Sequence, residues 1–208
     1  MSGQEKLILH SYRRCPFAMR VRMVLHEKGL DFETLEENLR NFSEELKKMH
    51  PEAKVPVLIH GDKVLYESAI ITEYLDETFP TPALMPENSW LRFQVRLWTY
   101  WCNQHFKAHV DHYKYGESRS QSQDVLMAPE RLTQDLSKLE QNLQHHPWLI
   151  GDEITLADFH VFPFVRQLKR ATPYFEVLDQ HPHTLAWLEK ICARPSFEKT
   201  MKKKKAVS

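Results

Sequence analysis

Residues 54–75 constrain the fold of this chain more than any other stretch. An apolar run over 55–59 ends near Gly61-Asp62, a two-residue connection suited to a tight type II′ hairpin turn. A second short apolar run follows, and from Ser68 onward apolar residues recur at helical spacing. The sequence therefore predicts a strand, a tight turn, a second strand and a helix in direct succession.

Two features of this stretch indicate a ligand site. Pro56 opens the first strand, where its missing N–H is tolerated, and the Val55-Pro56 bond is one at which a cis peptide costs little. The backbone N–H and C=O of Val55 are then available to a peptide-like ligand. Ser68 begins the helix, and helix N-termini bind anions through free N–H groups. We therefore expect a strand edge for a peptide-like molecule beside a pocket for its carboxylate.

Composition excludes several classes of protein. Of 208 residues, 42% are hydrophobic and 27% charged, which is typical of a globular chain. Lys+Arg and Asp+Glu both total 28, so no net charge favours nucleic acid or an anionic membrane as a partner. No apolar run approaches the ~20 residues of a membrane span, and the N-terminus lacks the apolar core of a signal peptide. Three widely spaced cysteines form no disulfide framework, and we expect a cytoplasmic protein.

The first part of the chain predicts alternating strands and helices. A short apolar run at 6–12 indicates a strand, and a helix follows from Pro16 to a stop at Gly29. A second strand is expected at 32–35 and a short helix at 43–49, ahead of the hairpin and helix described above. The order is β-α-β-α-β-β-α, with the first two strands parallel and the last two antiparallel.

The second part predicts only helices. Prolines within 80–86 mark a linker, and helical patterns follow from 87 to about 115, from Pro129 to about 144, and over 183–193. Thr155 and Asp158 are spaced as the capping residues of another helix, with a structural role. We therefore expect an α/β domain over 1–79, a linker over 80–86 and an all-helical domain over 87–208.

Cys15 is the main candidate for chemistry. With Pro16 at the first helical position, Cys15 is the expected N-cap, where the helix dipole favours a thiolate. Arg13 and Arg14 add positive charge nearby, and the thiolate is the reactive form of cysteine. The alternative is a small packing cysteine, which is the favoured interpretation for Cys102 and Cys192.

Histidines and tryptophans of the long helix are weaker candidates. His105, His109 and His112 are spaced four and three apart, as a metal site on one helix face would require. No cysteine or carboxylate clearly completes such a set, so we expect packed or solvated histidines and no metal. His105 alone could face a cleft. Trp98 and Trp101 could line an apolar pocket, although aromatic residues on a long helix usually belong to the core.

These residues together resemble the cytosolic glutathione transferase superfamily over nearly the whole chain. Val55-Pro56 is similar to the family's Val-cis-Pro, Glu67-Ser68 to its acidic-Ser pair, and Thr155-Leu156-Ala157-Asp158 to its capping box. Cys15-Pro16-Phe17-Ala18 resembles the omega class, in which a cysteine replaces the catalytic Tyr or Ser. The resemblance implies an α/β thioredoxin-like N-terminal domain followed by an all-α helical-bundle C-terminal domain.

The resemblance also implies roles for individual residues. Cys15 would form a mixed disulfide with glutathione, the cosubstrate, in a thiol transferase or reductase reaction. Phe42 stands where omega proteins have a lysine that contacts glutathione. Arg40 or Lys54 would then make the contact that this lysine makes in omega proteins. The implied glutathione site comprises Arg40, Lys54, Val55, Pro56, Glu67 and Ser68, of which Glu67 would bind the γ-glutamyl ammonium and Ser68 its carboxylate. A second, small hydrophobic or disulfide substrate would contact Tyr12, Phe17, Trp98, Trp101 and His105.

Two other functions remain open at this point. One is conjugation of glutathione to electrophiles, for which Cys15 would be dispensable. The other is a non-enzymatic role, as in chloride intracellular channel proteins or the stringent starvation regulator of RNA polymerase. Beta-class transferases also use a cysteine, together with a histidine near the position of His105.

By analogy with the family we expect a homodimer.

Overall fold

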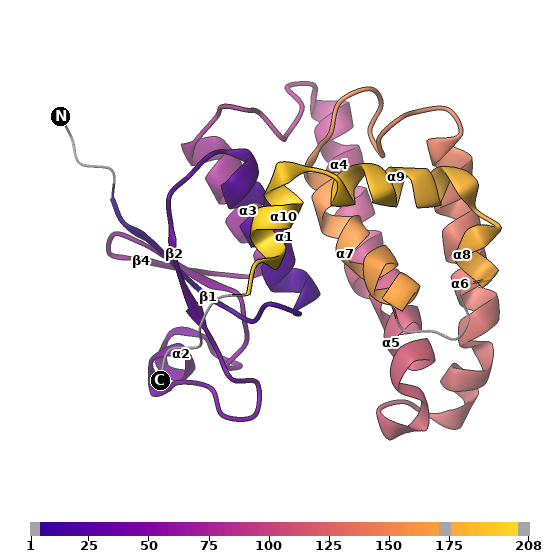
Figure 1. Cartoon of the computed structure of the whole chain (residues 1–208), viewed down its shortest axis with the longest axis horizontal. Helices are drawn as coiled ribbons and strands as arrows, with labels where there is room; N and C mark the ends of the chain where they lie inside the picture. Colours follow the sequence, from indigo (N-terminus) through magenta and orange to yellow (C-terminus); the bar gives the residue numbers. More distant parts are fainter. Residues whose placement is uncertain (1–4, 171–175, 204–208) are drawn as a thin grey trace. The chain divides into compact units, whose positions relative to one another are not determined.

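The computed structural model describes residues 5–170 and 176–203 (Figure 1). Its contacts divide the chain into two compact units. Unit 1 contains the residues up to Ala83 together with those from Pro195 onward, and unit 2 is Leu84–Arg194. Whether residues 1–79 and 87–208 fold as separate domains stays a prediction.

Unit 1 has the predicted order of strands and helices. It comprises β1 (Leu7–Ser11), α1 (Pro16–Glu27), β2 (Glu33–Glu36), α2 (Glu44–Met49), β3 (Val57–His60), β4 (Lys63–Tyr66) and α3 (Ser68–Thr78). The strands lie in the order β2-β1-β3-β4, with β1 and β2 parallel and the other neighbours antiparallel. The thioredoxin-like fold class is confirmed.

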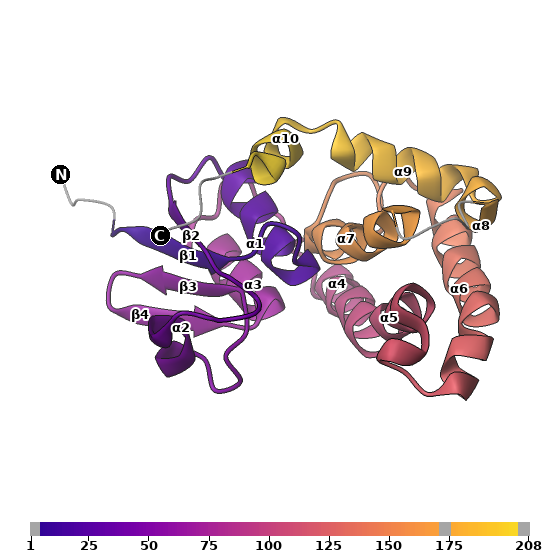
Figure 2. The same cartoon turned by 60° about the horizontal axis from the view of Figure 1, so that its bottom comes forward.

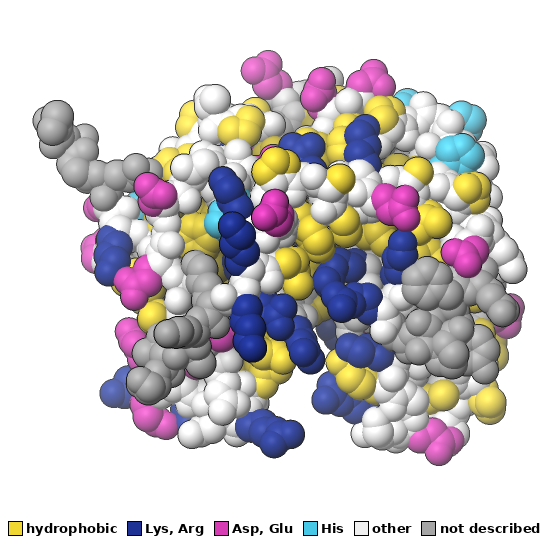
Figure 3. All heavy atoms as spheres, in the orientation of Figure 1, with side chains coloured by type: hydrophobic (Ala, Val, Ile, Leu, Met, Phe, Trp, Pro, Cys, Tyr) yellow, Lys and Arg dark blue, Asp and Glu magenta, His cyan; other side chains and the backbone are white. Residues whose placement is uncertain are grey.

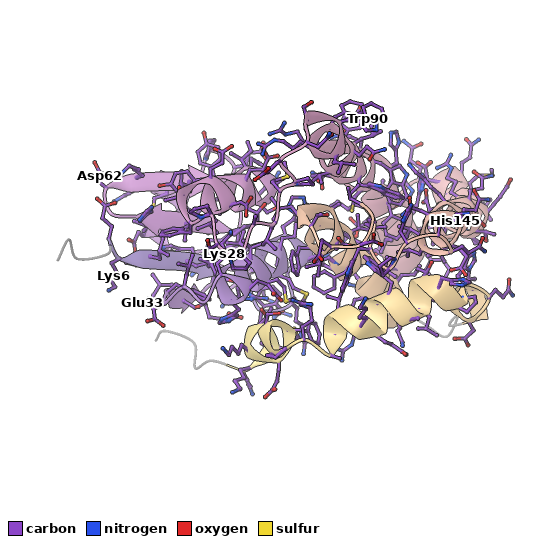
Figure 4. All side chains as sticks on the ribbon, turned by 90° about the horizontal axis from the view of Figure 1, so that it is seen from above. Lys6, Lys28, Glu33, Asp62, Trp90 and His145 are labelled. Carbon is purple, nitrogen blue, oxygen red and sulfur yellow. The ribbon has the colours of Figure 1, made fainter. Side chains whose placement is uncertain are left out.

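Sequence pattern explains this sheet. Leu7 and Leu9 of β1 are buried, and Gly61 takes a φ of 61°, which a type II′ turn requires at its first central position. The helices α1 and α3 pack against each other, while α2 lies apart from them and packs Leu46 against Val57 (Figure 2). Figure 4 shows Asp62 at the tip of the β3–β4 hairpin.

A buried lysine ties α1 to the end of α3. The side chain of Lys28, labelled in Figure 4, is fully buried, and its Nζ lies 2.7 Å from Asp76 Oδ1. The same ammonium donates to the carbonyls of Phe79 and Pro82, each at 2.7 Å. These three acceptors satisfy the ammonium, and they fix the start of the predicted linker on α1.

Unit 1 also contains a helix that the sequence analysis did not predict. The helix α10 (Pro195–Met201) packs on α1, and Ser196 donates a hydrogen bond to Glu27. The sequence pattern predicts a last helix over 183–193, followed by Arg194-Pro195. Proline is also suited to the first position of a new helix. The backbone N–H at that position has no partner within the helix, so its absence in proline costs no hydrogen bond.

Unit 2 is helical, as expected. Its helices are α4 (Ser89–Trp101), a π-helical segment (Cys102–Phe106), α5 (Lys107–Tyr115), a 3-10 turn (Gly116–Ser118), α6 (Ser122–Leu143), α7 (Leu156–Arg170), α8 (Glu176–Asp179) and α9 (Pro182–Cys192). The expected long helix at 87–115 is therefore interrupted by a π-helical turn. Asp158 accepts hydrogen bonds from the N–H groups of Thr155 and Leu149 and from Trp187 Nε1, each at 2.9 Å, so its role is structural.

The prediction that a helix starts at Pro129 is wrong. The helix α6 begins at Ser122 and carries Pro129 in its interior. The ion pair between Asp124 and Arg131, at 2.9 Å, spans the proline, and Ala128 is buried. Proline removes one backbone hydrogen bond from the helix, and the ion pair links the turns on either side of that position. Within residues 5–170 and 176–203, no helix has the length and apolar character needed to cross a bilayer.

Candidate active site

Cys15 lies at the N-terminus of α1, next to the head of β3. It is the N-cap residue and Pro16 follows at the first helical position, as predicted. Its backbone N–H donates to the carbonyl of Tyr12 at 2.9 Å, and its carbonyl accepts from Met19 at 2.9 Å. The thiol Sγ lies 3.9 Å from the carbonyl oxygen of Val55. Cys15 and the Val55-Pro56 motif, both candidates from the sequence, therefore lie next to each other in unit 1.

The charge environment of Cys15 differs from the expected one. Burial raises the pKa of the thiol. The backbone N–H groups of Ala18 and Phe17 favour the thiolate and lower the pKa, but the effect of burial is larger. The cations that act on it are Arg22 and Arg20, not the expected Arg13 and Arg14. Helical side chains point back toward the helix N-terminus, so the two arginines further along α1 approach Cys15. In the free protein the thiol form is thus favoured, contrary to the expectation from the helix dipole alone.

Arg22 braces the loop that carries Cys15. Its Nη1 donates to Ser11 Oγ at 2.5 Å and to the carbonyl of Tyr12 at 3.2 Å, and its Nη2 donates to the carbonyl of Arg13 at 2.7 Å. Burial is the main cause that lowers the pKa of Arg22 to about 10, so it stays cationic at neutral pH. The sequence analysis missed this residue. An arginine between Val21 and Met23 on a buried helix was the available signal.

Val55 and Pro56 are placed to receive an extended ligand. The peptide bond between them is cis. Val55 is buried and lies two residues before the start of β3. Its N–H and C=O therefore stand outside the hydrogen-bonded ladder of the sheet. Tyr12 and Cys15 pack against the buried cluster that includes Val55, so this backbone segment borders the thiol.

Glu67 and Ser68 form the start of α3. Glu67 has a φ of 68°, a conformation that non-glycine residues rarely adopt and that often occurs at ligand sites. Ser68 is buried at the first helical position, and its Oγ accepts a hydrogen bond from Nη1 of the buried Arg20 at 3.3 Å. The guanidinium of Arg20 also lies 4.9 Å from the centre of the Phe17 ring. The helix N-terminus and Arg20 together suit a carboxylate.

The two residues proposed to replace the omega lysine lie on different loops. Arg40 is exposed after β2 and lines an open groove that also includes Tyr12 and Asn38. Lys54 is exposed and paired with Glu52, and this hydrogen bond raises the pKa of the lysine. The pairing of Lys54 with Glu52 does not prevent binding of a carboxylate, because an exposed ion pair is weak.

A buried pair supports the loop that carries Arg40. His10 Nδ1 lies 2.7 Å from Glu37 Oε1, and Ser43 donates to the same carboxylate through its N–H at 3.0 Å and its Oγ at 2.7 Å. Burial opposes ionisation of Glu37, yet these hydrogen bonds together lower its pKa. The sequence analysis missed this pair, since residues 10 and 37 are far apart in the chain. It fixes the start of α2, and with it one wall of the groove.

The remaining predicted residues lie in unit 2. The rings of Trp98 and Trp101 meet edge to face at 5.3 Å, with Lys138 Nζ 5.0 Å and 4.5 Å from their centres. Trp101 is buried, and His105 lies in the π-helical segment, 6.3 Å from the ring of Tyr100. Tyr12 and Phe17 belong to unit 1, so the expected second-substrate site stays a prediction. Among the described residues no group of His, Cys, Asp or Glu could hold a metal ion.

Fold and site together define a class of protein. A four-stranded thioredoxin-like unit presents a cysteine beside a cis-proline loop and a helix N-terminus suited to a carboxylate, and a helical unit accompanies it. This combination defines the cytosolic glutathione transferases. The sequence matches the models for the N-terminal domain of glutathione S-transferase over residues 9–83 and for its C-terminal domain over residues 103–195.

Similarity to individual proteins agrees with this class. The chain is 30% identical to glutathione S-transferase U19 of Arabidopsis thaliana, over 94% of this chain and 90% of that protein. It is 29% identical to a stringent starvation protein A homolog of Haemophilus ducreyi, over 89% of this chain and 85% of the relative. The structure of glutathione S-transferase I bound to lactoylglutathione is similar with a TM-score of 0.79 and 26% identity, covering 94% and 98% of the two chains. The protein belongs to the glutathione S-transferase family.

Proposed function

We propose that this protein is an omega-like glutathione transferase of the cysteine type, with thiol transferase or reductase activity. The observation that carries the proposal is the position of Cys15 at the N-terminus of α1, with its Sγ 3.9 Å from the carbonyl of Val55. No hydroxyl replaces it at that helix position. A catalytic hydroxyl would stabilise the thiolate of glutathione, whereas a thiol can form a disulfide with it.

The reaction takes place in two exchanges. The Cys15 thiolate attacks the glutathione sulfur of a mixed disulfide, which forms a Cys15–glutathione disulfide and releases the substrate as a thiolate. A second glutathione, as its thiolate, then attacks the glutathione sulfur of that disulfide. Oxidised glutathione leaves and the Cys15 thiolate returns. Each exchange forms one S–S bond and breaks one, so no metal or other redox group is required.

Glutathione would lie across the edge of unit 1 next to Cys15. The backbone of Val55, before Pro56, pairs with its cysteinyl part, and the carboxylate of Glu67 meets the γ-glutamyl ammonium. Ser68 and the N-terminus of α3 bind the γ-glutamyl carboxylate, where the buried Arg20 adds a positive charge. Arg40 and Lys54 remain the two candidates for the glycyl carboxylate.

The second substrate is a small hydrophobic or disulfide molecule. Its proposed contacts are Tyr12 and Phe17 of unit 1 and Trp98, Trp101 and His105 of unit 2. Tyr12 packs, like Cys15, against the buried cluster that includes Val55, which supports the assignment of Tyr12. We also propose a cytoplasmic location, which the three free cysteines of the chain support.

Intact mass after incubation with oxidised glutathione tests the cysteine mechanism. We expect one glutathione adduct on the wild type and none on Cys15→Ala. The matched control is Cys192→Ala, because Cys192 is also free and half-buried. An adduct on Cys15→Ala equal to that on the wild type would contradict the proposal.

Conjugation of glutathione to electrophiles is the second candidate. Burial raises the pKa of Cys15, and this favours a reaction in which that thiol need not ionise. Aryl-halide conjugation that survives Cys15→Ala would support it. A non-enzymatic role is the third candidate, supported by the stringent starvation protein A relative, and failure to bind immobilised glutathione would favour it.

An exposed apolar stripe on α4 supports the homodimer. Trp90, Phe93, Leu97 and Tyr100 are 61%, 49%, 49% and 59% exposed, and their spacing of three, four and three places them on one helix face. The rings of Trp90 and Phe93 stack at 5.2 Å, and Figure 4 shows Trp90 at the outer side of α4. A contiguous apolar patch on a folded chain indicates an interface. We propose a second copy of the chain as its partner.

A further inference from the structure

A second pocket of unit 1 lies between β2, α1 and α10, and none of its lining residues belongs to the proposed set of glutathione contacts. Its polar lining includes Arg13, Arg22, Lys199, Lys202, Thr200 and Glu36. Four of these side chains are cationic and one is anionic. Figure 3 shows Lys and Arg side chains gathered beside and below α10. The pocket is therefore suited to an anion.

Among the residues that the structure describes, two buried polar groups of this pocket have no hydrogen-bond partner. Arg22 is 4% exposed, and although both of its terminal nitrogens donate to Ser11, Tyr12 and Arg13, its Nε–H is unpaired. Thr200 is 2% exposed and its Oγ1 is unpaired as well. Buried donors without a partner are rare in folded proteins. The pocket as a whole has room for about one oxygen atom, which could satisfy both groups.

The pocket continues into an open groove along the end of α1. The pocket and the groove share three lining residues, His26, Phe32 and Lys199. The groove is also lined by Gly29, Leu30 and Asp31. The rings of His26 and Phe32 lie 5.0 Å apart and form an apolar wall. A ligand whose anionic group enters the pocket can therefore lay an organic group along the groove.

We propose that this pocket binds the phosphate group of a small phosphomonoester. One phosphate oxygen accepts hydrogen bonds from Arg22 Nε–H and the Thr200 hydroxyl, and the others face the ammonium groups of Lys199 and Lys202. The number of donors favours phosphate over carboxylate, because a phosphomonoester presents three charged oxygens and a carboxylate only two. A buried water could satisfy the two unpaired groups, but it would not account for four surrounding cations.

Titration calorimetry with phenyl phosphate at constant ionic strength tests the proposal. We expect the wild type to bind phenyl phosphate, to bind inorganic phosphate more weakly, and not to bind phenol. The double variant Lys199→Gln/Lys202→Gln should lose about tenfold or more in affinity, and Thr200→Val about fivefold. Thr200→Ser, which keeps the hydroxyl, should restore binding. The matched control is Lys203→Gln, next to the pocket but outside its lining, which should change affinity less than twofold (a rough bound for exposed charges).

Amide chemical shifts separate this pocket from the start of α3, the other anion site. We expect phenyl phosphate to shift the amides of Thr34, Lys199 and Thr200. Shifts confined to Ser68 and its neighbours, or no binding by the wild type at millimolar phosphate, would overturn the proposal. Equal affinity of a folded Thr200→Val variant would also overturn it, since the attraction would then come from surface lysines alone. Far-UV circular dichroism of each variant establishes that it is folded.

Discussion

Arg20 Nη1 donates a hydrogen bond to Ser68 Oγ across 3.3 Å, and this contact joins α1 to the first turn of α3. The arginine is fully buried, so little water screens its charge. A negative group bound at the start of α3 therefore has both the helix N-terminus and a guanidinium beside it. The hydroxyl of Ser68 links the guanidinium of Arg20 to this helix N-terminus.

Substitution of this arginine should weaken glutathione binding. We expect Arg20→Met, which keeps much of the side-chain volume, to raise the Kd for S-methylglutathione about tenfold, roughly the value of a charge-assisted hydrogen bond. Tryptophan fluorescence titration measures this Kd. An exposed arginine of the same unit, Arg14, serves as the control through Arg14→Met. An unchanged Kd in folded Arg20→Met would show that the buried charge plays no part in binding.

The alkylation rate of Cys15 should rise with pH through an elevated midpoint. Burial is the main cause that raises the pKa of this thiol, so the reactive thiolate becomes the main form only above the ordinary cysteine pKa of about 8.5. Arg20→Met should raise the midpoint further, because one of the two opposing cations is then absent. Iodoacetamide kinetics between neutral and alkaline pH, followed by mass, provide the measurement. A midpoint below about 8.5 in the free wild type would contradict the burial argument.

Replacing Arg22 by lysine should destabilise unit 1 and reduce reactivity of Cys15. Lysine keeps the charge but cannot donate to Ser11, Tyr12 and Arg13 at once. We expect a loss of about 1–3 kcal/mol in the free energy of unfolding, the usual cost of leaving buried acceptors unpaired. Urea unfolding at constant m-value measures it. Wild-type stability together with wild-type alkylation rates would mean that the brace has no function.

Glu37 should contribute stability that is lost in acid. Its pKa is lowered in the folded protein, so the contribution is fully present above its unfolded value of about 4.3 and disappears as pH falls through the folded value. Glu37→Gln should therefore lose about 1–3 kcal/mol at neutral pH, and the difference from the wild type should shrink in acid. Unfolding midpoints measured from pH 7 down to pH 3 give this difference. A gap that stayed constant over that range would refute a role for the ionised carboxylate.

The stripe on α4 should control association. Leu97→Glu places a charge within the apolar face, and we expect light scattering to change from the mass of a dimer to that of a monomer. Leu126→Glu is the matched control, since Leu126 is also exposed, at 79%, but lies on α6. A monomeric wild type, or a Leu97→Glu variant that still dimerises, would exclude this face as the interface.

Local sequence signals were sufficient for the fold class. The turn at Gly61, the N-cap at Cys15 and the cap residues Thr155 and Asp158 are each specified by neighbours a few residues away, and the structure contains all of them. Prolines were more difficult. The local pattern predicts a helix start at Pro129 and no helix after Pro195, because packing against distant helices decides whether a helix continues or begins at a proline.

The candidate site was predictable where a motif carries it. Cys15, Val55 and Ser68 come from short patterns, and the structure places the first two side by side. Arg20 and Arg22 were missed because arginine is usually exposed, although the apolar residues Met19, Val21 and Met23 flank both of them. The direction of the Cys15 pKa shift also depends on burial, which no local pattern reports.

The packing of α10 on α1 means that unit 1 is assembled from one segment that precedes unit 2 and one that follows it. A ribosome making this chain releases α1 long before Pro195–Met201 exists, so α1 must wait with one face uncovered while the whole helical unit is synthesised. The first unit to emerge is then the last to be completed. A nascent chain stalled before Pro195 would present that bare helix face to chaperones.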